Sequence, residues 1–152
     1  MRVGELCCRE VVFIGKDDSV FEAAGLMRSY QVGDVVVVEQ QDGRNIPVGI
    51  LTDRDIVIEL VADRVDYNDV AIKDVMSFQL VTATEDEDVM DALERMKTKG
   101  VRRLPVVDGA GALVGILAVD DLIEQITEQL SDLVSLISKA RRSEQRKHSM
   151  IA

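Results

Sequence analysis

The feature that most constrains the fold of this chain is an internal repeat. When the 152-residue sequence is shifted by 69 residues, positions 20–38 fall on positions 89–107, and apolar residues align along the stretch. The aligned pairs include Val20 with Val89, Ala23 with Ala92, Met27 with Met96 and Val32 with Val101. The register then changes by three residues, because the turn at 39–45 is longer than the turn at 108–111. A length change confined to a turn is well tolerated, so the chain is expected to fold as two copies of one unit.

Each copy predicts the element order β-α-β-β-α. A short apolar strand, at 11–14 or 80–83, precedes a helix whose apolar residues recur at helical spacing. Two strands joined by a Gly-containing turn follow, and a second helix begins near Asp53 or Asp120. The paired strands are 35–38 with 48–51 and 104–107 with 113–117. Because 35–38 is a run of four valines, that strand is expected to be covered on both faces, which favours an α/β fold.

The charge and hydropathy of the chain exclude several classes of function. The net charge of −10 argues against nucleic-acid binding, which needs a basic surface to neutralise phosphates. Apolar runs are too short for a signal peptide or a membrane span, so a cytoplasmic protein without a membrane contact is expected. In that compartment Cys7 and Cys8 are expected to be reduced, half-buried thiols.

The acidic run 85–88 is interpreted as the start of a helix and not as a metal site. Carboxylates offset the positive end of a helix dipole, and Thr84 with Glu87 has the spacing of a capping box. No His or Cys stands nearby to complete a ligand set, so no metal is expected. The sequence also lacks a Ser-His-Asp or Cys-His set and a Gly-rich phosphate loop, so no catalytic residue is assigned and an enzyme is not predicted.

Three motifs resemble those of the CBS-domain family. They are VGILTDRDI at 48–56, GVRRLPVVD at 100–108 and LVGILAVDDL at 113–122, and the segments 4–7 and 73–76 fit the lead-ins of the two repeats. The resemblance covers residues 3–125. It implies a tandem pair of repeats packed pseudo-symmetrically, a Bateman module of α/β class, and the helical pattern after Asp120 adds an extended C-terminal helix. The expected boundaries are 1–60 for repeat 1, 61–71 for a linker, 72–126 for repeat 2 and 127–152 for the helix and a basic tail.

The resemblance also implies a regulatory module with an adenosine ligand in the cleft between the repeats. The family binds AMP, ADP, ATP, S-adenosylmethionine and sometimes NAD, with the Asp of the T-x-x-D motif on the ribose and the Thr toward the phosphate. AMP, ADP or ATP is the expected ligand here, no cofactor is required, and a ligand-free dimerisation or interaction module is the alternative. Because a carboxylate accepts two hydrogen bonds, it suits a ribose diol.

Carried onto this sequence, the family pattern gives a first site with both parts of the T-x-x-D motif. Its expected residues are Ile50, Thr52, Asp55, Met76, Val81, Val101, Arg102 and Arg103. In the gamma subunit of the AMP-activated kinase, basic residues at the positions of the two arginines face phosphates. The alternatives are that Asp55 caps the second helix or pairs with Arg54, and that the arginines form a solvated edge pair.

The second site is expected to be weaker. Its residues would be Cys7, Val12, Val32, Gly33, Ile116 and Asp121. Ala118 stands where the first site has a Thr, and Asp34 on the same wall would repel a phosphate. The site is therefore expected to be empty or to hold an uncharged part of a ligand.

The segment from Asp120 to Lys147 is predicted to be one helix with a heptad seam. The seam residues are Ile123, Ile126, Leu130, Leu133, Ile137 and Ala140. An apolar stripe must be buried, and a homodimer through this helix is the favoured way. The alternatives are that the helix packs on its own module, or that the dimer uses the repeat helices around Met27 and Met96. A basic tail, 139–147, follows, and no function is assigned to His148. An unidentified regulated protein remains a further partner.

Overall fold

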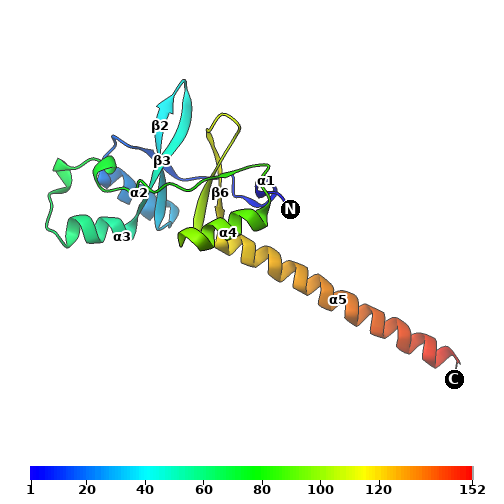
Figure 1. The fold of residues 1–152 in the computed structure, drawn as a ribbon. Coiled ribbons are helices and arrows are strands. Elements are labelled where there is room, and N and C mark those ends of the chain that lie inside the picture. Colours follow the sequence, from blue (N-terminus) through cyan, green and yellow to red (C-terminus); the bar gives the residue numbers. More distant parts are fainter. Residues whose placement is uncertain (152) are drawn as a thin grey trace. The chain divides into compact units, whose positions relative to one another are not determined.

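The computed structural model describes residues 1–151 and divides the chain into two compact units. The first unit is Met1–Leu117 and holds both sheets, and the second starts at Ala118. The first repeat contains α1 (Val3–Leu6), β1 (Phe13–Gly15), α2 (Val20–Tyr30), β2 (Asp34–Gln41), β3 (Arg44–Thr52) and α3 (Asp53–Ile56). A π-helical turn η1 (Val57–Val61) and the 3-10 turns η2 (Tyr67–Asp69) and η3 (Ile72–Asp74) follow. The second repeat contains β4 (Ala83–Thr84), α4 (Val89–Lys99), β5 (Arg103–Val107) and β6 (Leu113–Ala118), and α5 spans Val119–Ile151 (Figure 1).

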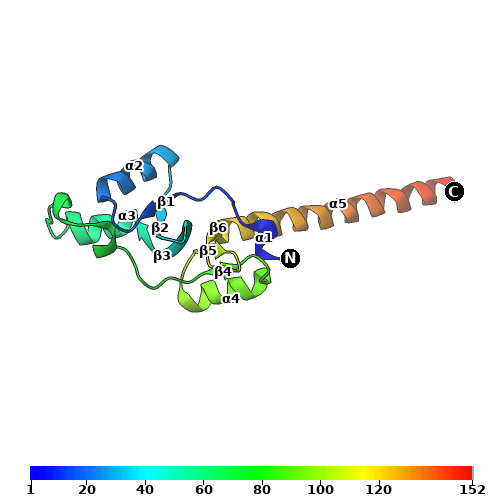
Figure 2. The same ribbon diagram turned by 90° about the horizontal axis from the view of Figure 1, so that it is seen from above.

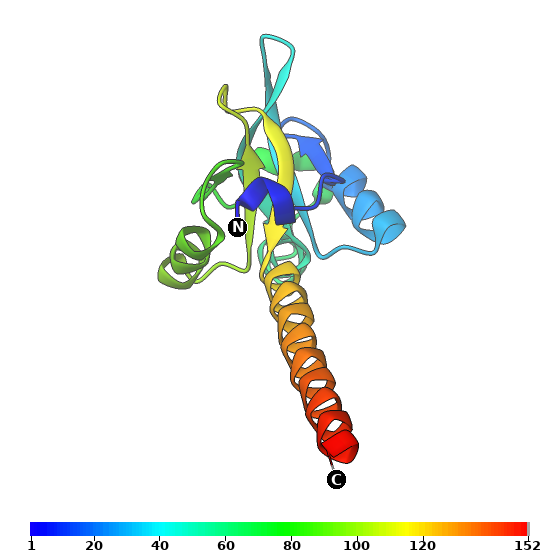
Figure 3. The same ribbon diagram turned by 90° about the vertical axis from the view of Figure 1, so that its right-hand side faces the viewer.

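Two small sheets of the same topology confirm the α/β class. Their strand orders are β1-β2-β3 and β4-β5-β6. In each sheet the first strand runs parallel to the second, with Phe13 beside Val36 and Ala83 beside Val106. The helices α2 and α4 lie on opposite outer sides of the two sheets (Figures 2 and 3).

The hairpin of the first repeat is longer than the sequence predicts. Its strands run to Gln41 and from Arg44, so that only Asp42 and Gly43 form the turn. Both have positive φ, 52° and 74°, which is the conformation that a two-residue Asp-Gly hairpin turn adopts. Conversely, β1 and β4 begin two and three residues later than expected, and the extended residues before them lie outside the sheets.

The lead-in segments are exchanged between the repeats. Cys8 in the first lead-in pairs with Ile116 in β6, and Ser77 in the second lead-in pairs with Ile50 in β3. Two further bridges repeat the exchange at the helix starts, Arg2 with Asp88 and Ser19 with Ala71. Because each bridge has its counterpart at the equivalent positions, the two repeats pack pseudo-symmetrically.

The exchange brings residues of the second repeat into the core of the first. Ile72 and Met76 are buried in one cluster with the inner residues of the first sheet and of α2. The other buried members are Ile14, Ala23, Met27, Val35, Val37 and Leu51. The sequence boundary at residue 72 therefore does not separate two cores in space.

Glycine is needed where each lead-in crosses a sheet. A Cβ at Gly49 in β3 would lie 2.7 Å from the carbonyl oxygen of Ser77 and 2.8 Å from the sulfur of Met76. A Cβ at Gly115 in β6 would lie 2.8 Å from the sulfur of Cys7. Real Cβ contacts are not this short, so the glycine of each V-G-I-L motif lets the other repeat's lead-in approach the strand.

The acidic run before α4 caps the helix differently from the prediction. The helix begins at Val89, and Asp88 is its N-cap, accepting a hydrogen bond from the Met90 amide at 2.8 Å. The Glu87 carboxylate does accept a hydrogen bond from the Thr84 amide at 3.3 Å, as the spacing predicts, but this turn precedes the helix, so Thr84 is not its N-cap. The same carboxylate forms a salt bridge with Arg95.

Candidate functional site

A cleft of about 350 Å³ lies between the two repeats within the first unit. Asp34 is at the start of β2, and Ile50, Thr52 and Asp55 come from the end of β3 and from α3. The lead-in of repeat 2 contributes Ser77 and Gln79, and the segment between α4 and β5, with the first residue of β5, contributes the rest. The residues lining the cleft are Asp34, Ile50, Thr52, Asp55, Ser77, Gln79, Val101, Arg102 and Arg103. Six of the eight residues expected in the first site thus lie together, and their binding role stays a prediction.

Thr52 and Asp55 hold each other at the junction of β3 and α3. The Asp55 amide donates to the Thr52 hydroxyl, and the Thr52 amide donates to the Asp55 carboxylate, both at 3.0 Å. This is a capping box, so Asp55 does cap the helix, as one alternative held. Arg54 donates its own amide to Asp53 at 2.8 Å. Capping fixes the orientation of Asp55, and a carboxylate has a second oxygen with which to accept hydrogen bonds.

Arg103 is paired across the cleft with Asp34. The Arg103 Nη1 and Asp34 Oδ2 atoms lie 2.6 Å apart, and the side chains are 40% and 19% exposed. The two residues are 69 positions apart, which is the offset of the repeat. Equivalent positions therefore face each other, so this pair lies at the pseudo-symmetry axis of the two repeats.

The position of Asp34 corrects the sequence interpretation, which placed it on the wall of the second site. It lines the first cleft, where it offsets the positive charge of Arg103. Ser77 and Gln79 also line the cleft and were not predicted from the sequence. The repeat offset makes Asp34 and Arg103 equivalent positions, but only the packing of the repeats shows that these positions face each other.

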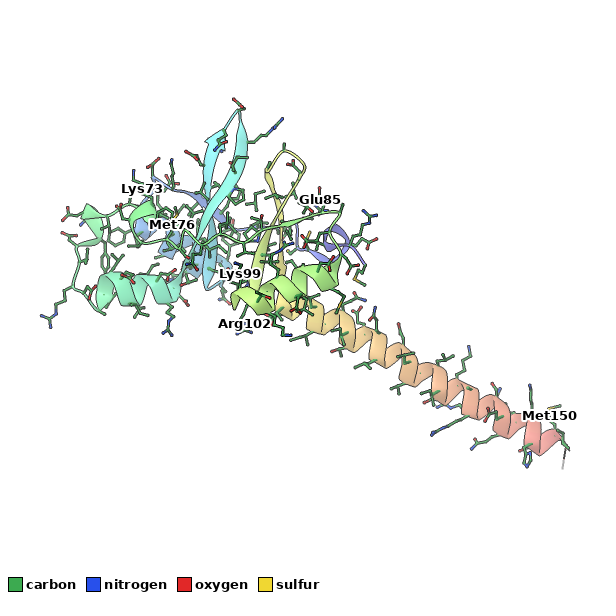
Figure 4. All side chains as sticks on the ribbon, viewed as in Figure 1. Lys73, Met76, Glu85, Lys99, Arg102 and Met150 are labelled. Carbon is green, nitrogen blue, oxygen red and sulfur yellow. The ribbon has the colours of Figure 1, made fainter. Side chains whose placement is uncertain are left out.

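A second hollow of about 530 Å³ adjoins the cleft and shares Gln79 and Val101 with it. It contains Val81, an expected site residue, and it is lined in addition by Leu80, Thr82, Arg95 and Lys99. Lys99 and Arg102 lie near the C-terminal end of α4 (Figure 4). Of the expected residues only Met76 lies apart, buried in the core cluster, where it packs beneath Gly49.

The residues of the second expected site are not all brought together. Val12 and Val32 line a hollow of about 520 Å³ with Leu26 and Tyr30. Cys7 is buried, and its sulfur packs close to Gly115.

The remaining residues of that site make other contacts. The carbonyl of Gly33 accepts a hydrogen bond from the Asp53 amide at 2.9 Å, and Ile116 pairs with Cys8. Asp121 belongs to the second unit, where its carboxylate accepts the Ala118 amide at 2.9 Å. The arrangement at Thr52 and Asp55 is reproduced there only in half, because alanine has no hydroxyl.

The two hollows beside the lead-ins differ in charge. Leu26 and Tyr30 in the first repeat stand at the positions of Arg95 and Lys99 in the second. Arg95 is held by the Glu87 carboxylate and donates to the Thr82 carbonyl at 2.6 Å. The side of the module that contains Asp55 is therefore the more basic one.

Among residues 1–151, no group of three or more His, Cys, Asp or Glu residues is placed to hold a metal ion. None of the helices in this part of the chain is both long and apolar enough to cross a membrane.

Comparison with known proteins identifies the class. The sequence model of the CBS-domain family matches residues 3–62 and again residues 72–128. The chain therefore belongs to the CBS-domain family and carries a CBS-domain pair.

Three relatives show how the pair is used in other chains. The uncharacterised protein MK0525 of Methanopyrus kandleri is 38% identical over 122 residues, which are 80% of this chain and 61% of that protein. The CBS domain-containing protein YhcV of Bacillus subtilis is 37% identical over 74% of this chain and 76% of its own length. Inosine-5′-monophosphate dehydrogenase of Methanocaldococcus jannaschii is 33% identical over 82% of this chain but only 23% of the enzyme. This chain thus spans less than two thirds of the first and the last of these relatives.

Solved structures confirm the fold. The CBS-domain pair of protein MJ0100, solved with 5′-methylthioadenosine and S-adenosylmethionine, superposes with a TM-score of 0.71 at 24% identity, covering 85% of this chain and 98% of that one. A hexameric CBS-CP12 protein from bloom-forming cyanobacteria superposes with a TM-score of 0.68 at 25% identity, covering 81% of this chain and 69% of that one.

Proposed function

We propose that this protein is a sensor that binds an adenine nucleotide, AMP, ADP or ATP, in the cleft between its two CBS repeats. The observation that carries the proposal is the convergence of Thr52 and Asp55 from one repeat with Arg102 and Arg103 from the other. The volume of the cleft lies in the range of small-molecule sites.

Each wall of the cleft suits one part of a nucleotide. Ile50 and Val101 offer apolar surface to a flat base, and Asp55 offers a carboxylate to the ribose hydroxyls. An arginine can form charge-assisted hydrogen bonds with a phosphate. The proposed role is binding without catalysis, since stand-alone CBS-domain pairs are typically regulatory.

Thermal unfolding with a panel of nucleotides tests the proposal. A ligand that binds only the folded state, at about 100 times its Kd, adds about 2.7 kcal/mol to the free energy of unfolding. For a chain of this size the melting temperature should rise on the order of 5–10 °C. No shift with AMP, ADP or ATP at millimolar concentration would refute the proposal and favour the ligand-free interaction module.

The variant Asp55→Ala should lose the shift, but it also removes the N3 carboxylate of the capping box whose N-cap is Thr52, and this lowers stability by itself. Asp88→Ala is the matched control, because Asp88 caps α4 and does not line the cleft. The control should melt lower than the natural chain and keep its full response to nucleotide. An equal response in both variants would show that Asp55 does not contact the ligand.

A second candidate ligand is favoured by the Asp34–Arg103 pair. An adenosyl ligand whose tail carries both charges, such as S-adenosylmethionine, would present a carboxylate to Arg103 and a cationic group to Asp34. NAD is the remaining adenosyl alternative. A larger shift with S-adenosylmethionine than with AMP at equal concentration would favour the zwitterionic ligand.

We further propose that the protein is a homodimer and that α5 takes part in the interface. The seam residues Ile126, Leu130, Leu133 and Ile137 are 50–58% exposed within one chain. Burying these side chains against a second helix would stabilise the dimer by roughly 25 cal/mol for each Å² of apolar surface removed from water. Sedimentation of the full chain measures the oligomeric state, and a monomer at tens of micromolar would refute this part of the proposal.

A further inference from the structure

The helix α5 has two halves of opposite charge. Residues 120–132 contain five acidic side chains and no Lys or Arg: Asp120, Asp121, Glu124, Glu128 and Asp132. Residues 133–147 contain five basic side chains and one acidic one: Lys139, Arg141, Arg142, Arg146 and Lys147, with Glu144. The helix is continuous through both halves, and its side chains beyond Gln125 are exposed.

From this separation of charge we infer that two copies of α5 pair in antiparallel orientation. The inference rests on the proposed homodimer and adds the orientation and register of its helices. In an antiparallel pair the acidic half of each helix lies along the basic half of the other. In a parallel pair the two acidic halves would lie together, and so would the two basic halves, which is repulsive over the whole length of the helix.

The apolar seam selects the same arrangement and fixes its register. With Ile123, Leu130 and Ile137 at the first core position of successive heptads, Ile126, Leu133 and Ala140 take the second. An antiparallel pair packs each first position against a second position of the partner. Ile123 then faces Ala140, Ile126 faces Ile137, and Leu130 faces Leu133, so every apolar side chain of the seam has an apolar neighbour.

The continuation of the seam disfavours the parallel alternative. The next core position after Ala140 is Glu144, and the one after it is Lys147. A parallel pair in register would bring the two Glu144 carboxylates together in its core, and next the two Lys147 ammonium groups. In the antiparallel register these residues extend beyond the apolar seam of the partner, so neither charge is set against its own copy.

The register also places specific charges beside one another. Arg141 lies on the flank of the seam next to the first core position, and Asp120, three heptads earlier, occupies the same heptad position on that flank. In an antiparallel pair this flank faces its own counterpart, so Arg141 of one copy lies alongside Asp120 of the other. The twofold relation forms the contact twice. Flanking charges of this kind set the orientation of paired helices.

A distance between spin labels tests the orientation directly. A ketone-bearing amino acid in place of Gln145, with a nitroxide attached, leaves both native cysteines untouched. In the antiparallel register two copies of position 145 are separated along the axis by about 27 residues, or about 40 Å at about 1.5 Å per residue. In a parallel pair the same labels would lie within about 20 Å, the width of two helices.

A label in place of Ser131 is the matched control, because position 131 lies at the centre of the antiparallel register and gives a short distance in either orientation. A long distance at 145 together with a short one at 131 is the expected result. Short distances at both positions would overturn the inference, and so would a monomer in sedimentation. Neither measurement contains nucleotide, so its outcome is independent of ligand binding.

Charge reversal gives a second test with opposite signs for the two orientations. Arg141→Glu should weaken the antiparallel dimer about threefold or more, because it sets a carboxylate beside Asp120 of the other copy at both ends of the twofold pair, and each exposed contact contributes up to about 1 kcal/mol. In a parallel dimer the same change would relieve repulsion between the two basic halves and leave the dimer unchanged or tighter. Arg44→Glu is the control, with the same charge change on an exposed residue outside α5. A dimer unaffected by the reversal at 141 would overturn the inference.

Discussion

The charge of Asp34 gives the sharpest prediction about ligand choice. Its carboxylate lies 2.6 Å from Arg103 Nη1 and competes with a phosphate for the same guanidinium group. Asp34→Asn keeps the size of the side chain and an acceptor oxygen but removes the negative charge. We expect the variant to bind AMP more tightly and to bind adenosine as the natural protein does.

The size of the effect follows from the geometry of the pair. Two unit charges about 4 Å apart in an effective dielectric of about 20 interact with about 4 kcal/mol, which is an upper limit. Because the Arg103 side chain is 40% exposed, solvent screening reduces the pair to the range of surface ion pairs, about 1 kcal/mol at most. The Kd for AMP should therefore fall by up to about fivefold, and the Kd for adenosine should change less than twofold.

Isothermal titration calorimetry of the natural protein and of Asp34→Asn, each with AMP and with adenosine, measures this difference in Kd. The gain for AMP should shrink as salt is raised, since screening weakens the charge on either partner. Arg103→Ala is the companion variant and should lose affinity for AMP while keeping affinity for adenosine. If Asp34→Asn weakens AMP, or if Arg103→Ala affects both ligands equally, the phosphate does not face Arg103 and the reasoning is wrong.

Two further predictions concern stability and reactivity. Gly49→Ala should lower the free energy of unfolding, measured in urea titrations, by about 1–3 kcal/mol, because the added Cβ overlaps the crossing lead-in. Gly25→Ala is the control at a helical site with open space, and it should raise the free energy of unfolding by about 0.5–1 kcal/mol. Equal effects of the two changes would contradict the close approach at Gly49. Burial raises the pKa of the Cys7 thiol, so a thiol reagent at pH 8 should modify the exposed Cys8 at once and Cys7 only after unfolding, and rapid reaction of both would show that Cys7 is accessible.

The sequence predicts those parts of the molecule that depend on local pattern. The repeat offset, the four-valine strand and the apolar spacing of the helices lead to two sheets of identical topology. The T-x-x-D motif at Thr52 and Asp55 leads to residues that line a cleft between the repeats. These features are set by period and spacing, which a single sequence carries.

What the sequence analysis missed depends on contacts between distant segments. Asp34 was assigned to the wrong wall, because its partner Arg103 is brought to it only by the packing of the two repeats. Met76 was expected in the cleft, yet the crossing of the lead-in over Gly49 turns it into the core. The capping of α4 by Asp88 was missed because four acidic residues in a row give no local preference among candidate caps.

The exchanged lead-ins make each repeat an incomplete folding unit. A fragment ending at residue 60 would lack Ile72 and Met76, which belong to its own core, and a fragment starting after the linker would lack the lead-in that pairs with β6. Two copies of the first fragment could each supply the lead-in that the other lacks, but this pairing would place the two Asp34 carboxylates against each other. In the whole chain Asp34 lies against Arg103. Opposite charges at one repeated position thus favour assembly of unlike halves. A chain cleaved within the linker should remain associated, because the lead-in of each half pairs with a strand of the other half.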